Sequence, residues 1–175
     1  MKHLLFFTVL LVLSLPLQSA ERYNFTSLDV SDGVPDNYIH EILRDGCGFM
    51  WFISGQTLTR YDGHDFKNYD LPVPGWHAYY KLNEDKYGNI WVRVHDSYFF
   101  YDRIKDRLNG DLSEVIDYPD INSGFLFFDV DYDGNLWFSQ KEGEIVRYGG
   151  KSDIRRYVLP EGSGLKRMES RNGKT

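Results

Sequence analysis

Three acidic residues at alternate positions form the most specific chemical pattern in the sequence. Asp129, Asp131 and Asp133 lie just before a glycine, Gly134. This spacing resembles the first half of a calcium-binding loop, in which alternate carboxylates and a glycine turn surround the ion with oxygen atoms. In a calcium-binding loop that begins at Asp129, the twelfth position is Gln140. A bidentate Glu normally stands there and completes the oxygen shell. Because a β-hairpin also needs an Asp and Gly turn, the pattern indicates either a Ca²⁺ site or a structural turn, and no other cofactor is indicated.

Side chains that could act as nucleophiles or bases are scattered along the chain. Cys47 is the one cysteine, so an internal disulfide cannot form, and no Cys/His cluster has the spacing of a zinc site. The histidines beyond the first twenty residues have no Ser, Cys or second carboxylate at a helpful spacing. We therefore expect no catalytic residue and a fold stabilised by a hydrophobic core. These histidines are His40, His64, His77 and His95.

One connecting segment places an aromatic residue beside polar groups. Trp76 and His77 follow the run Pro72-Val73-Pro74-Gly75. Loops of this kind often carry binding residues, and an aromatic plate beside polar groups suits contact with a ligand. Trp76 and His77 are therefore candidate ligand-binding residues, with packing of Trp76 beneath the loop as the alternative.

Composition excludes several classes of function. Aromatic residues make up 17% of the 175 residues, a share that argues against disorder. Asp and Glu together number 26 and Lys and Arg 20, which gives a net charge of -6. No block of Lys or Arg interrupts the aromatic-rich part, so the sequence lacks the basic surface that nucleic acid binding requires. We expect no nucleic acid partner.

Residues 1–20 have the pattern of a secretory signal peptide. Lys2 is followed by an apolar run from Leu4 to Leu15, and small residues, Ser19 and Ala20, come at the end. The run is too short to span a bilayer comfortably, and no second hydrophobic stretch follows. We expect cleavage near residue 20 and export of the remainder, with an uncleaved anchor as the alternative.

An internal repeat organises the rest of the chain. The pattern Asp-x-x-Gly-x-apolar-Trp-apolar occurs three times, and a Tyr follows each Trp ten or eleven positions later. The Trp residues succeed one another at intervals of 40 and 46 residues. Each Asp and Gly has a local reason to recur, because the turn needs a residue tolerant of positive φ and a carboxylate that accepts hydrogen bonds from turn amides. The repeated residues are Asp45, Gly48, Trp51 and Tyr61; Asp85, Gly88, Trp91 and Tyr101; and Asp131, Gly134, Trp137 and Tyr148.

A repeat of this length, built from short aromatic strands and glycine turns, is typical of one four-stranded propeller blade. We predict an all-β fold, a partial β-propeller of about three four-stranded antiparallel blades at residues 38–72, 77–113 and 124–160. Residues 23–28 are expected to add an N-terminal strand, and residues 161–175 a polar tail. Trp51, Trp91 and Trp137 should be equivalent buried residues on the second strands, since neighbouring blades cover both faces of a strand.

The first repeat carries a family resemblance. Residues 25–45, Gly48 to Phe52 and Thr59 to Tyr69 resemble the two-component regulator propeller repeat. The resemblance implies the periplasmic input region of a hybrid histidine kinase, typically of Bacteroidota, which senses oligosaccharides released from complex glycans. Two departures weaken the match, since Gln56-Thr57-Leu58 replaces the usual Gly-Leu and no small residue follows Trp91.

Three hypotheses about function follow. Family members resemble two complete propellers with further domains and kinase parts, so the favoured hypothesis is a truncated or split sensor segment without catalytic activity. Its partners would be an oligosaccharide and either the remaining blades or another copy of the chain. The second hypothesis is a secreted propeller enzyme of quinoprotein or lyase type, although the quinoprotein Trp falls four places after the Gly and here it falls three. The third is a nonfunctional remnant.

Overall fold

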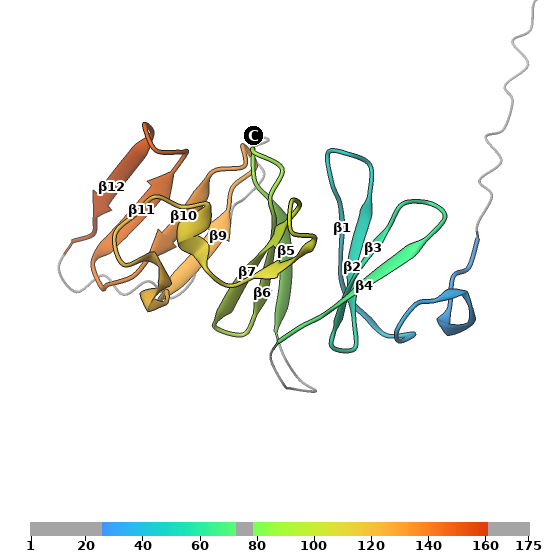
Figure 1. The fold of residues 1–175 in the computed structure, drawn as a ribbon. Coiled ribbons are helices and arrows are strands. Elements are labelled where there is room, and N and C mark those ends of the chain that lie inside the picture. Colours follow the sequence, from blue (N-terminus) through green and yellow to red (C-terminus); the bar gives the residue numbers. More distant parts are fainter. Residues whose placement is uncertain (1–25, 73–78, 161–175) are drawn as a thin grey trace, which may run out of the picture.

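The structure, a computed structural model, describes residues 26–72 and 79–160. It contains three four-stranded antiparallel sheets, each formed by four strands that are consecutive in the chain. The sheets stand side by side as a fan (Figure 1), so the all-β prediction of three four-stranded blades is confirmed.

Blade 1 comprises β1 (Ile39–Arg44), β2 (Met50–Ser54), β3 (Thr57–Tyr61) and β4 (Phe66–Asp70). Blade 2 comprises β5 (Tyr80–Glu84), β6 (Ile90–Val94), β7 (Ser97–Asp102) and β8 (Arg107–Asn109). Blade 3 comprises β9 (Phe127–Val130), β10 (Leu136–Ser139), β11 (Glu144–Tyr148) and β12 (Ile154–Val158).

The expected N-terminal strand is not found in the part of it that the structure describes. Residues 26–28 belong to no strand, and the first element is the 3-10 turn η1 (Val30–Asp32). The Asp29 carboxylate accepts a hydrogen bond from the Ser31 N–H, and the Asp32 carboxylate accepts one from the Asp29 N–H. This reciprocal cap satisfies backbone donors locally and fixes the turn that follows the expected strand.

The repeated Asp and Trp side chains bind each other in every blade. In blade 1, Asp45 accepts hydrogen bonds from the N–H groups of Cys47 and Phe49 through Oδ1, and from Trp51 Nε1 through Oδ2, all within 2.9 to 3.0 Å. The corresponding Nε1 to Oδ2 distances are 2.9 Å from Trp91 to Asp85 and 2.7 Å from Trp137 to Asp131. The motif glycines Gly48, Gly88 and Gly134 have φ angles of 95°, 79° and 72°, a region that only glycine enters at little cost.

Blades 1 and 2 each pack their Trp-bearing face against the next blade. The Trp51 ring lies 4.8 Å from the Tyr101 ring of blade 2, and the Trp91 ring lies 5.1 Å from the Phe128 ring of blade 3. Trp51 is 0% and Trp91 is 2% exposed. Two hydrophobic clusters result, one between blades 1 and 2 and one between blades 2 and 3.

Trp137 differs from its two counterparts, so the expectation of three equivalent buried Trp residues is wrong. Its side chain is only half-buried. It stacks on Tyr157 of its own blade, with ring centroids 5.6 Å apart. Within the described ranges no further blade follows β12 to cover this face, and burial of a blade residue depends on that neighbour.

A polar network supplements the apolar contact between blades 1 and 2. Asp106, in the turn between β7 and β8, accepts hydrogen bonds of 2.7 Å from both the Tyr69 and the Tyr101 hydroxyls and forms an ion pair with Lys67. These hydrogen bonds, the one from Lys67 foremost, hold the pKa of Asp106 well below its ordinary value. Burial, followed by the hydrogen bonds to Tyr101 and Asp106, raises the pKa of Tyr69. The ionised form of Asp106 therefore joins the two blades.

The difference between the Trp residues predicts unequal effects of truncation. Trp91→Ala should lower the free energy of unfolding by about 3 to 5 kcal/mol, because it leaves a cavity between two blades. Trp137→Ala should lower the free energy of unfolding clearly less, because the Trp137 ring is half-exposed and packs only on its own blade. Denaturant titration followed by circular dichroism measures both losses, and equal losses would contradict the packing described above.

The Asp106 network predicts a specific dependence on acid. The folded-state pKa of Asp106 lies below the ordinary value of 3.8. Its stabilisation is therefore complete above pH 3.8 and is lost as the pH falls toward the lower folded-state pKa. Asp106→Asn should reduce the slope of stability against pH below about pH 4 relative to the unchanged chain. Asp96→Asn, at an exposed turn, is the matched control, and an identical slope in all three proteins would rule the network out as a source of stability.

Candidate ligand-binding site

The two ends of the blades carry different kinds of connection. The repeated Asp turns lie at one end, which we call the motif end. The other end, which we call the loop end, carries the β2–β3, β6–β7 and β10–β11 turns together with the connections from one blade to the next. The connection from blade 2 to blade 3, residues 110–126, is longer than that from blade 1 to blade 2, residues 71–79.

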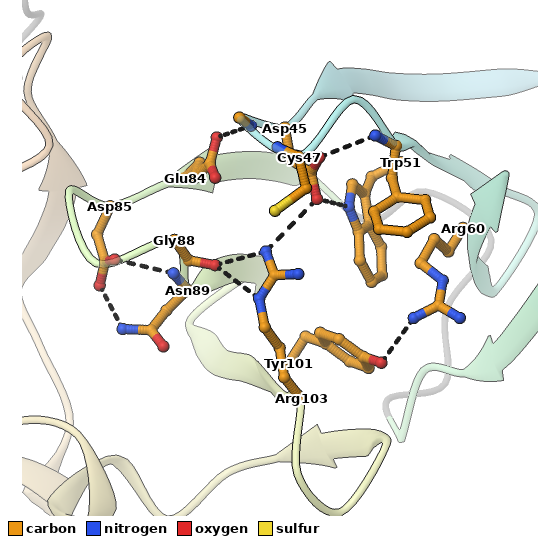
Figure 2. Close-up of polar contacts among 12 residues, drawn as sticks. Asp45, Cys47, Trp51, Arg60, Glu84, Asp85, Gly88, Asn89, Tyr101 and Arg103 are labelled. Carbon is orange, nitrogen blue, oxygen red and sulfur yellow. Dashed lines mark hydrogen bonds and ion pairs between the residues drawn. The ribbon is translucent and has the colours of Figure 1, made fainter. Parts of the chain in front are cut away.

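The motif end is occupied by contacts that join the blades. Arg103 donates to the Gly88 carbonyl at 2.8 Å and lies 3.5 Å from the Asp45 carboxylate of blade 1 (Figure 2). Glu84 accepts a hydrogen bond of 2.8 Å from the Gly46 N–H. Blades 2 and 3 are joined at this end in the same way. Those contacts run from the Lys86 N–H to the Gly134 carbonyl, at 3.0 Å, and from the Tyr87 hydroxyl to the Gly149 carbonyl, at 2.7 Å.

The long connection at the loop end is fixed to the core. It contains the 3-10 turns η2 (Leu112–Glu114) and η3 (Ile121–Ser123). Asn122 ties the two turns together, because it accepts from the Leu112 N–H at 2.9 Å and donates to Asp111 at 2.8 Å. The apolar side chains Leu112, Ile116 and Ile121 are buried in the cluster between blades 2 and 3. The segment therefore forms an ordered wall over blade 3.

A pocket of about 320 Å³ lies between this wall, the β10–β11 turn and β12. Gln140 Nε2 closes one side, since it donates to the Asp120 carbonyl at 2.6 Å and to Ser123 Oγ at 3.2 Å. Lys141 and Glu144 pair with each other at 2.8 Å. The volume is within the range of small-ligand sites in proteins.

An aromatic ring and an unpaired guanidinium form the other side of the pocket. The Arg156 guanidinium lies 5.3 Å from the centre of the Tyr118 ring, and the Tyr118 ring meets the Phe138 ring edge-on at 5.1 Å. Arg156 has no ion pair and no side-chain hydrogen bond with any residue that the structure describes. Its N–H donors, beside an aromatic ring and several acceptors, suit recognition of a polar ligand.

The residues singled out from the sequence lie elsewhere. Trp76 and His77 lie outside the described residues. Asp129 forms an ion pair of 2.5 Å with Lys81, and Asp133 is exposed on its turn. Asp131 is partly buried, which opposes ionisation, but hydrogen bonds from Trp137 and Asn135 still lower its pKa.

The structure does not bring the carboxylates of Asp129, Asp131 and Asp133 together. Among the described residues, no cluster of three or more His, Cys, Asp or Glu side chains could hold a metal ion. Calcium binding stays a prediction, and two of its three carboxylates already have protein partners.

Sequence reasoning missed the pocket residues Tyr118 and Arg156. Both look like ordinary surface residues in the sequence, and they meet only because the connection 110–126 folds back onto β12. The available signal was the greater length of this connection, because long connections in compact domains often carry function.

Within the described ranges, no helix is both long and apolar enough to cross a membrane.

Comparison with known proteins finds similar folds among solved structures. No family model matches the chain, and no curated protein does. The extracellular domain of the putative hybrid two-component system BT3049 from B. thetaiotaomicron aligns with a TM-score of 0.50 and 16% identity, over 76% of this chain and 20% of that one. The corresponding domain of BT4673 from the same organism gives 0.48 and 19%, over 78% and 18%. A catalytically inactive virginiamycin B lyase from Staphylococcus aureus gives 0.45 and 20%, over 74% and 44%.

At these identities the likeness concerns the fold. This chain spans less than half the length of each of these solved chains, and only 20% of the BT3049 chain. The likeness to BT3049 agrees with the sequence resemblance to the two-component regulator propeller repeat. The chain therefore shares the propeller-blade fold found in the extracellular domain of a hybrid two-component system.

Proposed function

We propose that this chain is a ligand-binding propeller segment of a periplasmic sensor, part of a hybrid two-component system that senses oligosaccharides to regulate glycan use. Three observations support this proposal: the propeller-blade fold, its likeness to the BT3049 extracellular domain, and the resemblance of the first repeat to regulator propeller repeats. We assign no enzymatic activity to residues 1–175. Phosphoryl transfer is proposed only for the sensor to which such a segment belongs.

The pocket at the loop end is the observation that carries the proposal. Sugar hydroxyls both donate and accept hydrogen bonds, so a site for them needs both kinds of group. Arg156 supplies donors, and the carboxylates of Asp120 and Glu144 supply acceptors. The N–H groups of the Gln140 amide are already used on Asp120 and Ser123. The apolar ring of Tyr118 and its hydroxyl add an amphipathic surface. An oligosaccharide end of one or two sugar units is the ligand class that this mixture fits best.

Export through the predicted signal peptide would place the pocket where released oligosaccharides are found. Lys2 and the apolar run Leu4 to Leu15 support this location. Intact-mass analysis of periplasmic extract should find a chain that begins near residue 21. Recovery of the uncleaved chain from the cytosol would contradict both the export and the sensor location.

The binding site itself is tested by calorimetric titration of the purified chain against a panel of plant and host oligosaccharides. We expect at least one sugar to bind, and Arg156→Ala to weaken its binding by about tenfold or more, or about 1.4 kcal/mol. Gln140→Ala should also weaken binding, because it releases the wall of the pocket.

Arg155→Ala is the matched control, since Arg155 is the exposed neighbour of Arg156 on β12 and does not line the pocket. It should leave the affinity unchanged. If no sugar binds, or if both arginine variants lose affinity equally, the pocket is not the sugar site.

A further inference from the structure

The contacts between blades have a direction. The Trp-bearing face of a blade meets the Tyr-bearing face of the next blade, as Trp51 meets Tyr101. Polar bonds follow the same direction: Arg60 of blade 1 donates to the Tyr101 hydroxyl at 2.9 Å, and the Tyr69 hydroxyl donates to Asp106 of blade 2 at 2.7 Å. Each blade thus has one face of each kind.

Blade 1 presents a Tyr-bearing face that no other blade covers among the described residues. Tyr61 corresponds to the buried Tyr101 and Tyr148, but it is half-buried and its hydroxyl donates to the Gly63 carbonyl of its own turn, at 2.8 Å. Ile42 pairs with the residue after the motif Trp, as Leu82 does in blade 2. Ile42 is 62% exposed, whereas Leu82 is 4% exposed.

Blade 3 presents the complementary, Trp-bearing face. Trp137 is half-buried and stacks on Tyr157, as Trp51 stacks on Tyr69 in blade 1. Tyr157 is 40% exposed, but its counterpart Tyr69 is 8% exposed and binds the next blade. The Tyr157 hydroxyl has no hydrogen bond to any described residue.

We infer that the Trp137 and Tyr157 face of one copy of this chain docks head to tail on the Ile42 and Tyr61 face of a second copy. The two faces are the two halves of an interface that the chain already forms twice within itself, which is why we choose a second copy as the occupant. The described residues of two copies supply six blades, within the range of about four to eight that closed propellers use. Ring closure would give a discrete dimer, since head-to-tail contacts end only when the ring closes.

The segment before β1 leaves room for this contact. Gly33 lies against the Phe66 ring on the outermost strand of blade 1. Phe52 on β2, which pairs with Ile42, is only 6% exposed, so this part of the face is already covered. Ile42 lies on β1, at the opposite edge of the same sheet, and stays exposed. The partner copy therefore meets Ile42 at the inner edge of the blade face. On the partner's side, the aromatic rings of Trp137 and Tyr157 are of the type that dominates interface energies.

Sedimentation velocity of the full chain over a range of concentrations tests the contact. We expect a species of twice the 20.6 kDa chain mass. Ile42→Asp and Tyr157→Asp should each raise the dissociation constant at least tenfold, and both keep Trp137 with its bond to Asp131. Ile104→Asp changes an equally apolar but fully exposed side chain on the β7–β8 turn, away from both faces, and should leave association unchanged. Melting curves verify that all variants are folded.

Mixing the variants tests the direction of the contact. Ile42→Asp keeps an intact blade 3 face and Tyr157→Asp an intact blade 1 face, so an equimolar mixture should regain one interface and associate more tightly than either variant alone. Open chains of more than two copies with the same variant pattern would also support the contact. A chain that stays monomeric at all concentrations, an association that either variant leaves unchanged, or a mixture that regains nothing would overturn the proposal.

Discussion

The bond between an Asp carboxylate and a Trp indole is the interaction on which the rest of this structure depends. It fixes the first turn of each blade and the position of the largest side chain at once, as in the 2.9 Å bond from Trp91 to Asp85. An indole N–H buried without a partner would cost free energy, and the carboxylate removes that cost. The ring is then held at the angle needed to enter the next blade. A local turn thereby determines a contact between units about 40 residues apart.

Much of the fold could be predicted from the sequence, because its information is local and repeated. The spacing of Trp51, Trp91 and Trp137 predicts the three blades, and short aromatic stretches between glycine turns predict their strands. The burial of Trp137 could not be predicted in the same way. Burial depends on what lies beyond a blade, and the repeat pattern is the same whether or not a neighbour covers it.

The candidate site was far less predictable than the fold, for a physical reason. Asp129 has calcium-like spacing in the sequence, but its carboxylate pairs with Lys81, which is 48 residues distant in the chain. The pocket arises where Tyr118, on an irregular connection, meets Arg156 on the outermost strand of blade 3. Neither contact follows a periodic pattern, so only the folded chain reveals them. Contacts between a loop and a distant strand carry the specificity that a repeat cannot encode.

The two ends of the blades differ in the contacts that they make. At the motif end the backbone and carboxylate groups are used to join neighbours, as in the bonds of Arg103 to Gly88 and Asp45. At the loop end the Tyr80 hydroxyl of blade 2 also bonds to the Gly55 carbonyl of blade 1, but the connections between blades can differ in length without disturbing the core. The pocket wall at residues 110–126 is nevertheless packed into the cluster between blades 2 and 3 through Ile116 and Ile121. The wall and the contact between these two blades therefore share one core, so a displacement of residues 110–126 would disturb both.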